Sequence, residues 1–165
     1  MRGLVVGRFQ PMHKGHEAVI RRAIEDCVHV VVAIGSSQAK QSVQDPFTLD
    51  ERQEMIRAVF GDAVEVFAVP DIHDPPNWVR HLTDITGPVD KVFGNDERTV
   101  SLFEDEGIPV VRSGLKDRET LEGKTIRLKM AEGDGTWRKS VPAPVVERID
   151  AWDVPVRLRR LEAML

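Results

Sequence analysis

Apolar, β-branched stretches alternate along this chain with stretches whose apolar residues recur at helical spacing. The first pattern predicts short buried strands, and the second predicts amphipathic helices. Strands that alternate with helices form a parallel sheet through right-handed crossovers, with helices on both faces. We therefore expect a Rossmann-like α/β fold with five parallel strands, at residues 3–7, 28–35, 63–69, 89–94 and 108–111.

The last quarter of the chain has a helical pattern without strands. Helices are expected at residues 124–131, 144–152 and 154–165. No repeat or linker divides the 165 residues, so we expect a single domain. It would consist of an alternating core over residues 1–121 and a helical C-terminal segment over residues 122–165.

Composition limits the class of protein. A hydrophobic fraction of 41% and a charged fraction of 30% are those of a soluble globular protein. No apolar run is long enough to span a membrane, no signal peptide is evident, and the single Cys27 falls on the apolar face of the first helix. We expect a cytoplasmic protein. The net charge of −4 gives no overall attraction for nucleic acid.

The segment between the first strand and the first helix carries the most chemistry. It reads Gly-Arg-Phe-Gln-Pro-Met-His-Lys-Gly-His over residues 7–16. At such a junction, free backbone N–H groups and the positive end of the helix dipole attract phosphate. His13 and His16 would point to one side of the first turn, with Gly15 letting a ligand approach. The segment predicts a phosphate site, which Arg8 also favours.

The histidine pair has two other interpretations. The histidines would be solvated if the segment were an ordinary turn, but the length and placement of the motif disfavour this. A zinc site would need further ligands, and His29, His73 and His81 are scattered without metal-site spacing. No metal site made by the protein is expected.

The same ten residues resemble the motif of the His-x-Gly-His nucleotidyltransferase superfamily. The segment Gly-Arg-Phe-Gln-Pro is similar to that of archaeal-type nicotinamide-nucleotide adenylyltransferases, and the resemblance extends to about Met130. It implies adenylyl transfer from ATP to nicotinamide mononucleotide (NMN), giving NAD and pyrophosphate, with His13, His16 and Arg127 as catalytic residues. It implies that ATP and its phosphates bind at Gly7, Arg8, Phe9, Lys14, Gly15, Lys124 and Thr125.

Three later segments extend this resemblance. Pro-Phe-Thr-x-x-Glu-Arg at residues 46–52 follows the second strand, although a helix-capping box by itself explains Thr48 and Glu51. The family usually has a basic residue where this chain has Gln44. The segment at residues 71–81 is similar to one whose aromatic residue lies near the nicotinamide ring. The residues expected to bind NMN are Ser36, Asp71, Asn77, Trp78 and Asn95. Asn95 or Asp96 could equally cap the helix that follows them.

The segment at residues 122–127 departs from the family pattern. Where small hydroxyl residues are usual, this chain has Glu122 and Lys124, and Thr125 stands two residues before Arg127 instead of three. Lys124 would attract a triphosphate, whereas Glu122 would repel it. We still expect the N-terminus of this helix to bind the β- and γ-phosphates, with altered geometry.

The chemistry implied by the resemblance needs neither a general base nor a covalent nucleophile, because the attacking phosphate oxygen is already ionised. Mg²⁺ is expected to bind mainly through the ATP phosphates. The resemblance also implies a homo-oligomer. Two alternatives stay open. One is adenylyl or cytidylyl transfer to another phosphorylated acceptor, such as flavin mononucleotide, phosphopantetheine or, with CTP, a polyol phosphate. The other is a non-catalytic module that senses NAD or another nucleotide.

Overall fold

The computed structural model describes residues 1–112 and 122–165. Residues 113–121, which belong to the expected alternating core, lie outside the described residues. The chain forms two compact units whose segments alternate along the sequence. The first unit contains residues 1–8, 18–38 and, as far as they are described, 62–112, and the second contains residues 9–17, 39–61 and 122–165.

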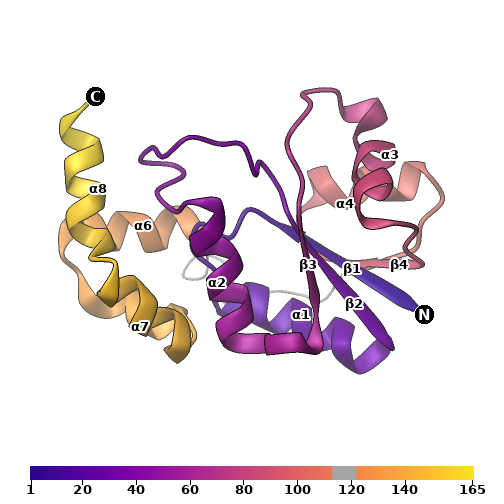
Figure 1. Cartoon of the computed structure of the whole chain (residues 1–165), viewed down its shortest axis with the longest axis horizontal. Helices are drawn as coiled ribbons and strands as arrows, with labels where there is room; N and C mark the ends of the chain where they lie inside the picture. The colour runs from indigo at the N-terminus through magenta and orange to yellow at the C-terminus, as the bar shows by residue number, and fades with distance from the viewer. Residues whose placement is uncertain (113–121) are drawn as a thin grey trace. The chain divides into compact units, whose positions relative to one another are not determined.

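The first unit contains the sheet. Its strands are β1 (Arg2–Gly7), β2 (His29–Ile34), β3 (Glu65–Ala68), β4 (Lys91–Phe93) and β5 (Val110–Val111). All described pairings are parallel and the order is β3-β2-β1-β4-β5, with Leu4 aligned with Val31 on one side and with Val92 on the other. The alternation in the sequence therefore predicted the sheet correctly (Figure 1).

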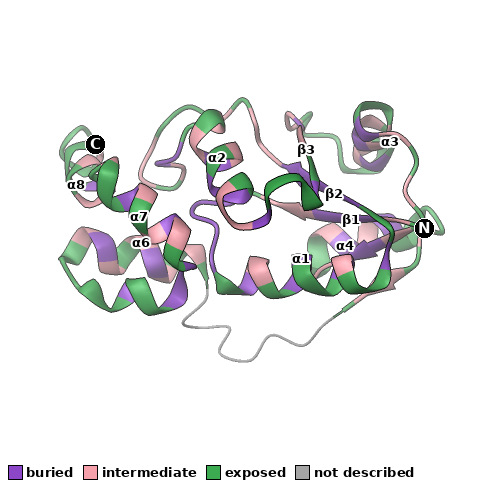
Figure 2. Ribbon diagram, turned by 60° about the horizontal axis from the view of Figure 1, so that its bottom comes forward, coloured by how far each residue is buried: buried purple, intermediate pink, exposed green. Residues whose placement is uncertain are grey.

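Helices cover both faces of this sheet. Helices α3 (Pro75–Thr86) and α4 (Glu97–Asp105) bury Val79, Leu82 and Phe103 against Leu4 and its neighbours on one face. Helix α1 (Lys14–Asp26) leads to Cys27 on the other face, where a Cβ on Gly3 would lie 2.9 Å from Cys27 Sγ. Strand β2 is accordingly buried from Val30 to Ile34 and β1 from Gly3 to Val5 (Figure 2), whereas β3 and β5 are at most half-buried.

Strands β2 to β5 are shorter than the apolar runs that predicted them, whereas β1 begins one residue earlier than expected, at Arg2. Val28 was expected to open the second strand, yet it is 80% exposed and the strand begins at His29. Runs of Val and Ile do not mark where pairing stops, because pairing depends on the length of the neighbouring strand. The only cysteine, Cys27, is buried as expected.

The second unit is helical. It contains α2 (Leu49–Phe60), α6 (Gly123–Glu132), the 3₁₀ turn η2 (Gly135–Ser140), α7 (Ala143–Ala151) and α8 (Val154–Ala163). Another 3₁₀ turn, η1 (Gly61–Ala63), follows α2. Thr48 and Glu51 form the predicted capping box at the start of α2. Helix α6 packs against α8, and α2 packs against α7 (Figure 1).

Gly133 ends α6. Its φ of 77° lies in the left-handed region, where glycine has no steric penalty, and its N–H caps Lys129 and Met130. Within the described part of the chain, no helix has the length and apolar character needed to cross a bilayer.

Candidate active site

The order of the strands defines where a ligand binds in the first unit. The order reverses between β1 and β4, and in open parallel sheets ligands bind beyond the carboxyl ends of the strands at such a reversal. Gly7 ends β1 at this edge, Arg8 follows it, and Asn95 follows β4. Three of the predicted site residues are therefore placed there by the topology, with Arg8 exposed.

In the second unit, the two histidines cap the start of α1 reciprocally. His13 precedes the helix, and its Nδ1 accepts from the backbone N–H of Gly15 (3.0 Å) and of His16 (3.4 Å). His16 Nδ1 accepts in return from the N–H of His13 (3.2 Å). This is the hydrogen-bond pattern of a capping box, made here by two imidazoles. The spacing of three residues places the Nδ1 of each ring beside the backbone N–H of the other histidine.

This capping overturns one expectation and sharpens another. The free N–H groups expected at the helix N-terminus are partly used, because His13 Nδ1 takes those of Gly15 and His16. Since both Nδ1 atoms accept hydrogen bonds, each neutral ring carries its proton on Nε2. The rings stack with centroids 3.8 Å apart. In this tautomer each ring can donate a hydrogen bond from Nε2. A phosphate bound at this helix start would then be contacted by the imidazoles.

Both histidines are held neutral. Burial lowers the pKa of His13 to about 4, and burial together with the neighbouring His13 lowers the pKa of His16 well below its usual range. A protonated ring would also lose Nδ1 as an acceptor and with it the cap. At neutral pH the pair therefore offers hydrogen bonds without positive charge.

We expect His13 to make stability depend on pH. Its pKa is about 4 in the folded protein and 6.5 in the unfolded chain, so the unfolded chain binds more protons between these values. The free energy of unfolding should then fall as the pH drops from 6.5 to 4, by about 3 kcal/mol. Denaturant titrations of the parent and of His13→Asn across this range measure the contribution. Asparagine Oδ1 can replace Nδ1 as the cap and does not titrate. If the free energy of unfolding fell equally steeply in both proteins, the contribution of His13 would be contradicted.

The residues around the histidines are largely buried. The ring of Phe9 is buried and lies 4.6 Å from the ring of His16, so this side chain supports the histidine instead of facing a ligand. Gly15 is buried and Lys14 is exposed. The sequence placed Phe9 among the ATP-binding residues, and of its groups the backbone is the part that can still serve this role.

Arg127 reaches back from α6 to the histidine segment. Its Nη1 donates to the carbonyl oxygen of Gln10 (2.7 Å). The path depends on Gly123 at the start of α6, where a Cβ would lie 2.8 Å from Arg127 Nη1 and 3.2 Å from the oxygen of Gln10. The structure thus brings Arg127 to the segment that carries His13. Lys124 is exposed and Thr125 half-buried in the first turn of the same helix.

The predicted NMN-binding residues belong to the first unit. The N–H of Asp71 donates to Gln38 Oε1 (3.0 Å), and Asp71 Oδ1 accepts from the N–H of His73 (2.8 Å), so the loop after β3 is ordered by its own side chains. His81 Nε2 donates to the oxygen of Pro70 (2.9 Å) at the base of this loop. Ser36, which follows β2, has a φ of 49°. The hydrogen bonds made by Gln38 and His81 were not predicted from the sequence, because no local pattern indicates them.

Asn77 and Trp78 lie in the first turn of α3. The indole of Trp78 is half-buried and meets Phe103 edge-on, with centroids 5.6 Å apart. Asn77 is exposed and donates from Nδ2 to Asp74 Oδ2 (2.8 Å). Asp74 is the N-cap residue of α3, but its side chain makes no capping bond, because its carboxylate is turned to Asn77.

Asn95 carries an unsatisfied donor at the carboxyl end of β4. Its Nδ2 is buried and has no hydrogen-bond partner among the described residues. A buried donor without a partner costs free energy unless a ligand or water completes it. This favours a ligand-binding role for Asn95 over the capping role that the sequence left equally open, and Asp96 is the residue at the N-cap of α4.

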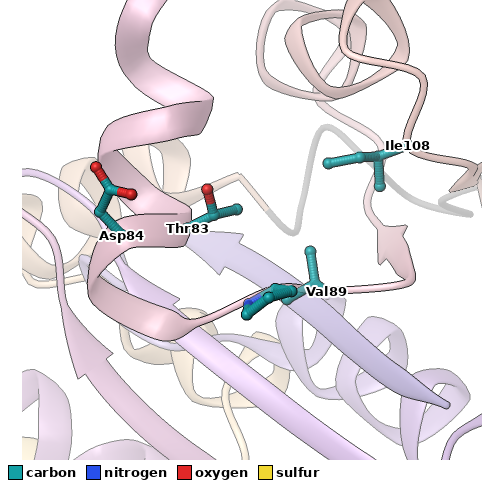
Figure 3. Close-up of a pocket in the computed structure, with 5 residues that line it drawn as sticks. Thr83, Asp84, Val89 and Ile108 are labelled. Carbon is teal, nitrogen blue, oxygen red and sulfur yellow. The ribbon is translucent and has the colours of Figure 1, made fainter.

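The first unit also has a surface hollow of about 490 Å³, which lies away from the carboxyl ends of the strands. It is lined by Thr83, Asp84, Pro88, Val89 and Ile108 (Figure 3). Pro88 and Val89 precede β4 and Ile108 precedes β5, so the hollow lies at the amino ends of these strands. It is therefore at the edge opposite the reversal point. Across residues 1–112 and 122–165, no group of three or more His, Cys, Asp or Glu side chains is arranged to hold a metal ion.

Known proteins are similar to this chain in sequence. The cytidylyltransferase-like family model matches residues 4–102. The nicotinamide-nucleotide adenylyltransferase of Picrophilus torridus is 36% identical over 165 residues, covering 98% of this chain and 97% of the relative. That of Haloarcula marismortui is 40% identical over 153 residues, covering 91% and 81%.

A solved structure shares the fold. It is a bifunctional NMN adenylyltransferase/ADP ribose pyrophosphatase from Francisella tularensis, complexed with AMP and a manganese ion, with a TM-score of 0.75 and 17% identity. The likeness covers 98% of this chain, which spans about half (52%) of the bifunctional protein.

The cytidylyltransferase-like family model covers most of strand β1, the whole of strands β2 to β4 and both histidines, and this places the chain among the nucleotidyltransferases. The similarity to the two archaeal relatives runs along nearly the whole chain. The chain therefore belongs to the nicotinamide-nucleotide adenylyltransferase family.

Proposed function

We propose that this protein transfers the adenylyl group of ATP to NMN. An oxygen of the NMN phosphate attacks the α-phosphorus of ATP and forms the new P–O bond. The bond from the α-phosphorus to the bridging oxygen breaks, and pyrophosphate leaves with the electron pair, giving NAD. The observation that carries the proposal is the imidazole capping box, which presents two neutral Nε2 donors in a member of this family.

Neutral donors suit this reaction. The attacking oxygen is already ionised, so the protein has to align it and to stabilise the charge that grows on the α-phosphate and on the leaving pyrophosphate. His13 and His16 donate to the α-phosphate oxygens from rings fixed by their own cap. Arg127, Lys124 and Thr125 bind the β- and γ-phosphates at the start of α6. Arg8 adds positive charge after β1.

Mg²⁺ accompanies the triphosphate in this proposal. The side chains proposed at the phosphates are imidazole, guanidinium and ammonium groups, which bind phosphate oxygens and leave the metal to the phosphates themselves. When bound, Mg²⁺ neutralises charge on the leaving group. No residue of the chain is assigned as its direct ligand.

The acceptor is proposed to bind through Ser36, Asp71, Asn77, Trp78 and Asn95 of the first unit. The nicotinamide ring of NMN is a cationic pyridinium, and indole provides the most favourable aromatic face for a cation. The buried Nδ2 of Asn95 offers a donor that a ribose or carboxamide oxygen would satisfy.

Trp78 provides a test of acceptor identity. Trp78→Leu is expected to weaken NMN binding by about 2- to 30-fold, because it removes a cation–π contact worth roughly 0.5–2 kcal/mol, and to leave ATP binding unchanged. Trp78→Phe keeps a ring against Phe103, and its affinity for NMN should lie between those of the parent and of Trp78→Leu. Calorimetric titration with each substrate measures both effects. Trp152→Leu, a half-buried tryptophan of the second unit, is the matched control. Equal losses for both variants would assign Trp78 to packing.

The proposed reaction is tested by incubating the purified protein with ATP, Mg²⁺ and NMN and measuring NAD and pyrophosphate. NAD should form with NMN, whereas flavin mononucleotide, phosphopantetheine and polyol phosphates should release little pyrophosphate. Parallel assays with nicotinic acid mononucleotide give the preference for nicotinamide. If pyrophosphate were released only with another acceptor, that acceptor would replace NMN as the proposed substrate. Binding of nucleotides without turnover would favour a sensing module.

Two further properties are proposed with this function. A cytoplasmic location is supported by the substrates, ATP and NMN. A homo-oligomer is supported by the C-terminal helix α8 and the residues after it, where Val156, Met164 and Leu165 are exposed apolar side chains. Light scattering of the purified protein measures the oligomeric number.

A further inference from the structure

One peptide group in the second unit is held from both of its polar sides. It joins Pro46 to Phe47, just before α2. Its N–H donates to Gln10 Oε1 (2.9 Å), and its carbonyl oxygen accepts from Arg157 Nη1 of α8 (3.0 Å). Gln41 Nε2 also donates to that oxygen (3.1 Å). Because both polar groups are engaged, this peptide cannot rotate without breaking hydrogen bonds on two sides.

On one side, Gln10 links this peptide to Arg127. The amide of Gln10 is only 4% exposed, and its Nε2 donates to the oxygen of Phe47 (3.1 Å) in addition to the bond at Oε1. The backbone oxygen of Gln10 accepts from Arg127 Nη1 (2.7 Å). A shift of the Phe47 backbone would therefore move the atom that holds the guanidinium of Arg127. Gln10 also stands three residues before His13.

On the other side, Arg157 is itself held rigidly. Its Nη1 and Nη2 contact Glu51 Oε1 (2.7 Å) and Oε2 (2.8 Å), and the two side chains are 21% and 13% exposed. Glu51 Oε1 also accepts from the N–H of Thr48 in the capping box (3.0 Å). A paired guanidinium fork of this kind fixes direction as well as distance, which a lysine ammonium does not.

We propose that Arg157 of α8 is a positioning residue for Arg127, acting through the Pro46–Phe47 peptide and Gln10. The inference rests on the proposed function, in which Arg127 binds the phosphates of ATP. It makes the C-terminal helix part of the working site even though Arg157 touches no substrate. A purely stabilising ion pair would instead make Arg157 matter for unfolding and leave ATP affinity alone.

A double-mutant cycle between Arg157→Lys and Gln10→Met tests this role. The first variant keeps the charge beside Glu51 and loses the fork, and the second keeps the volume and loses both side-chain hydrogen bonds. We expect each single variant to weaken ATP binding by about 10-fold. The double variant should lose about 10- to 20-fold, not the product of about 100-fold, because both changes release the same peptide. Affinity for NMN should stay near that of the parent.

Arg148→Lys is the matched control. Arg148 of α7 also faces a carboxylate of α2, with its Nε 3.7 Å from Glu54 Oε1, and its Nη1 donates to the oxygen of Pro144. We expect it to leave ATP affinity unchanged and to be additive with Gln10→Met. Thermal melting of every variant separates loss of fold from loss of affinity. If Arg157→Lys does not fold, Gln41→Met, which loses the third bond to the same peptide, takes its place in the cycle.

The results distinguish this inference from the proposed reaction. ATP affinity is measured by calorimetry without an acceptor, so a parent that binds ATP and makes no NAD would overturn the acceptor and leave the cycle interpretable. Additive losses, or equal losses for ATP and NMN, would overturn the role of Arg157 and leave adenylyl transfer standing. A parent that does not bind ATP would overturn both.

Discussion

His16→Asn is expected to lower kcat by about 10²- to 10³-fold while the melting temperature stays close to that of the parent. The rate falls because the Nε2 donor to the α-phosphate is lost, and the removal of one such donor typically costs this much. Stability is retained because asparagine Oδ1 can take the place of Nδ1 and accept the N–H of His13. Steady-state kinetics with ATP and NMN, together with thermal melting, measure the two effects.

His16→Gln separates the two functions of the ring. Its amide nitrogen can reach toward the position of Nε2, but its oxygen is displaced from the capping position. This variant should retain more activity and melt lower than His16→Asn. His29→Asn changes an exposed histidine at the start of β2 and should alter neither property. Normal turnover by His16→Asn would remove His16 from the proposed mechanism.

Arg127→Ala is expected to lower kcat/KM for ATP by about 10- to 150-fold, which corresponds to the roughly 1.5–3 kcal/mol of a charge-assisted contact with phosphate. The KM for NMN should change far less, because the guanidinium is assigned to the β- and γ-phosphates. Kinetics with each substrate varied in turn provide the measurement. Lys129→Ala removes a positive charge from the same helix and is the control for a general loss of charge.

Gly123→Ala tests the same contact without removing Arg127. The added Cβ would lie 2.8 Å from Arg127 Nη1, so the end of this flexible side chain has to move away from the oxygen of Gln10. We expect a smaller loss of kcat/KM for ATP in the same direction as in Arg127→Ala. If both variants affected the two substrates equally, Arg127 would be a structural residue.

The sequence by itself determined the elements and the order in which they could be assembled. Apolar runs and helical spacing each depend on residues close together in the chain, and they predicted the five parallel strands and the helices that cover them. The capping box of Thr48 and Glu51 was predicted for the same reason, because all its partners lie within one turn. The His-x-Gly-His spacing is equally local, and it predicted phosphate chemistry where the first strand leads into the first helix.

Only the tertiary structure decided how the groups of the candidate site are held. The two imidazoles cap each other, and this fixes their tautomers and uses N–H groups that the sequence left for phosphate. Gln10 meets the backbone of Phe47 across 37 residues, and Arg157 meets Glu51 across 106. Such contacts leave no periodic pattern, since a single glutamine or arginine has many possible partners. The folded chain selects one of them by bringing a peptide group that needs hydrogen-bond partners within reach.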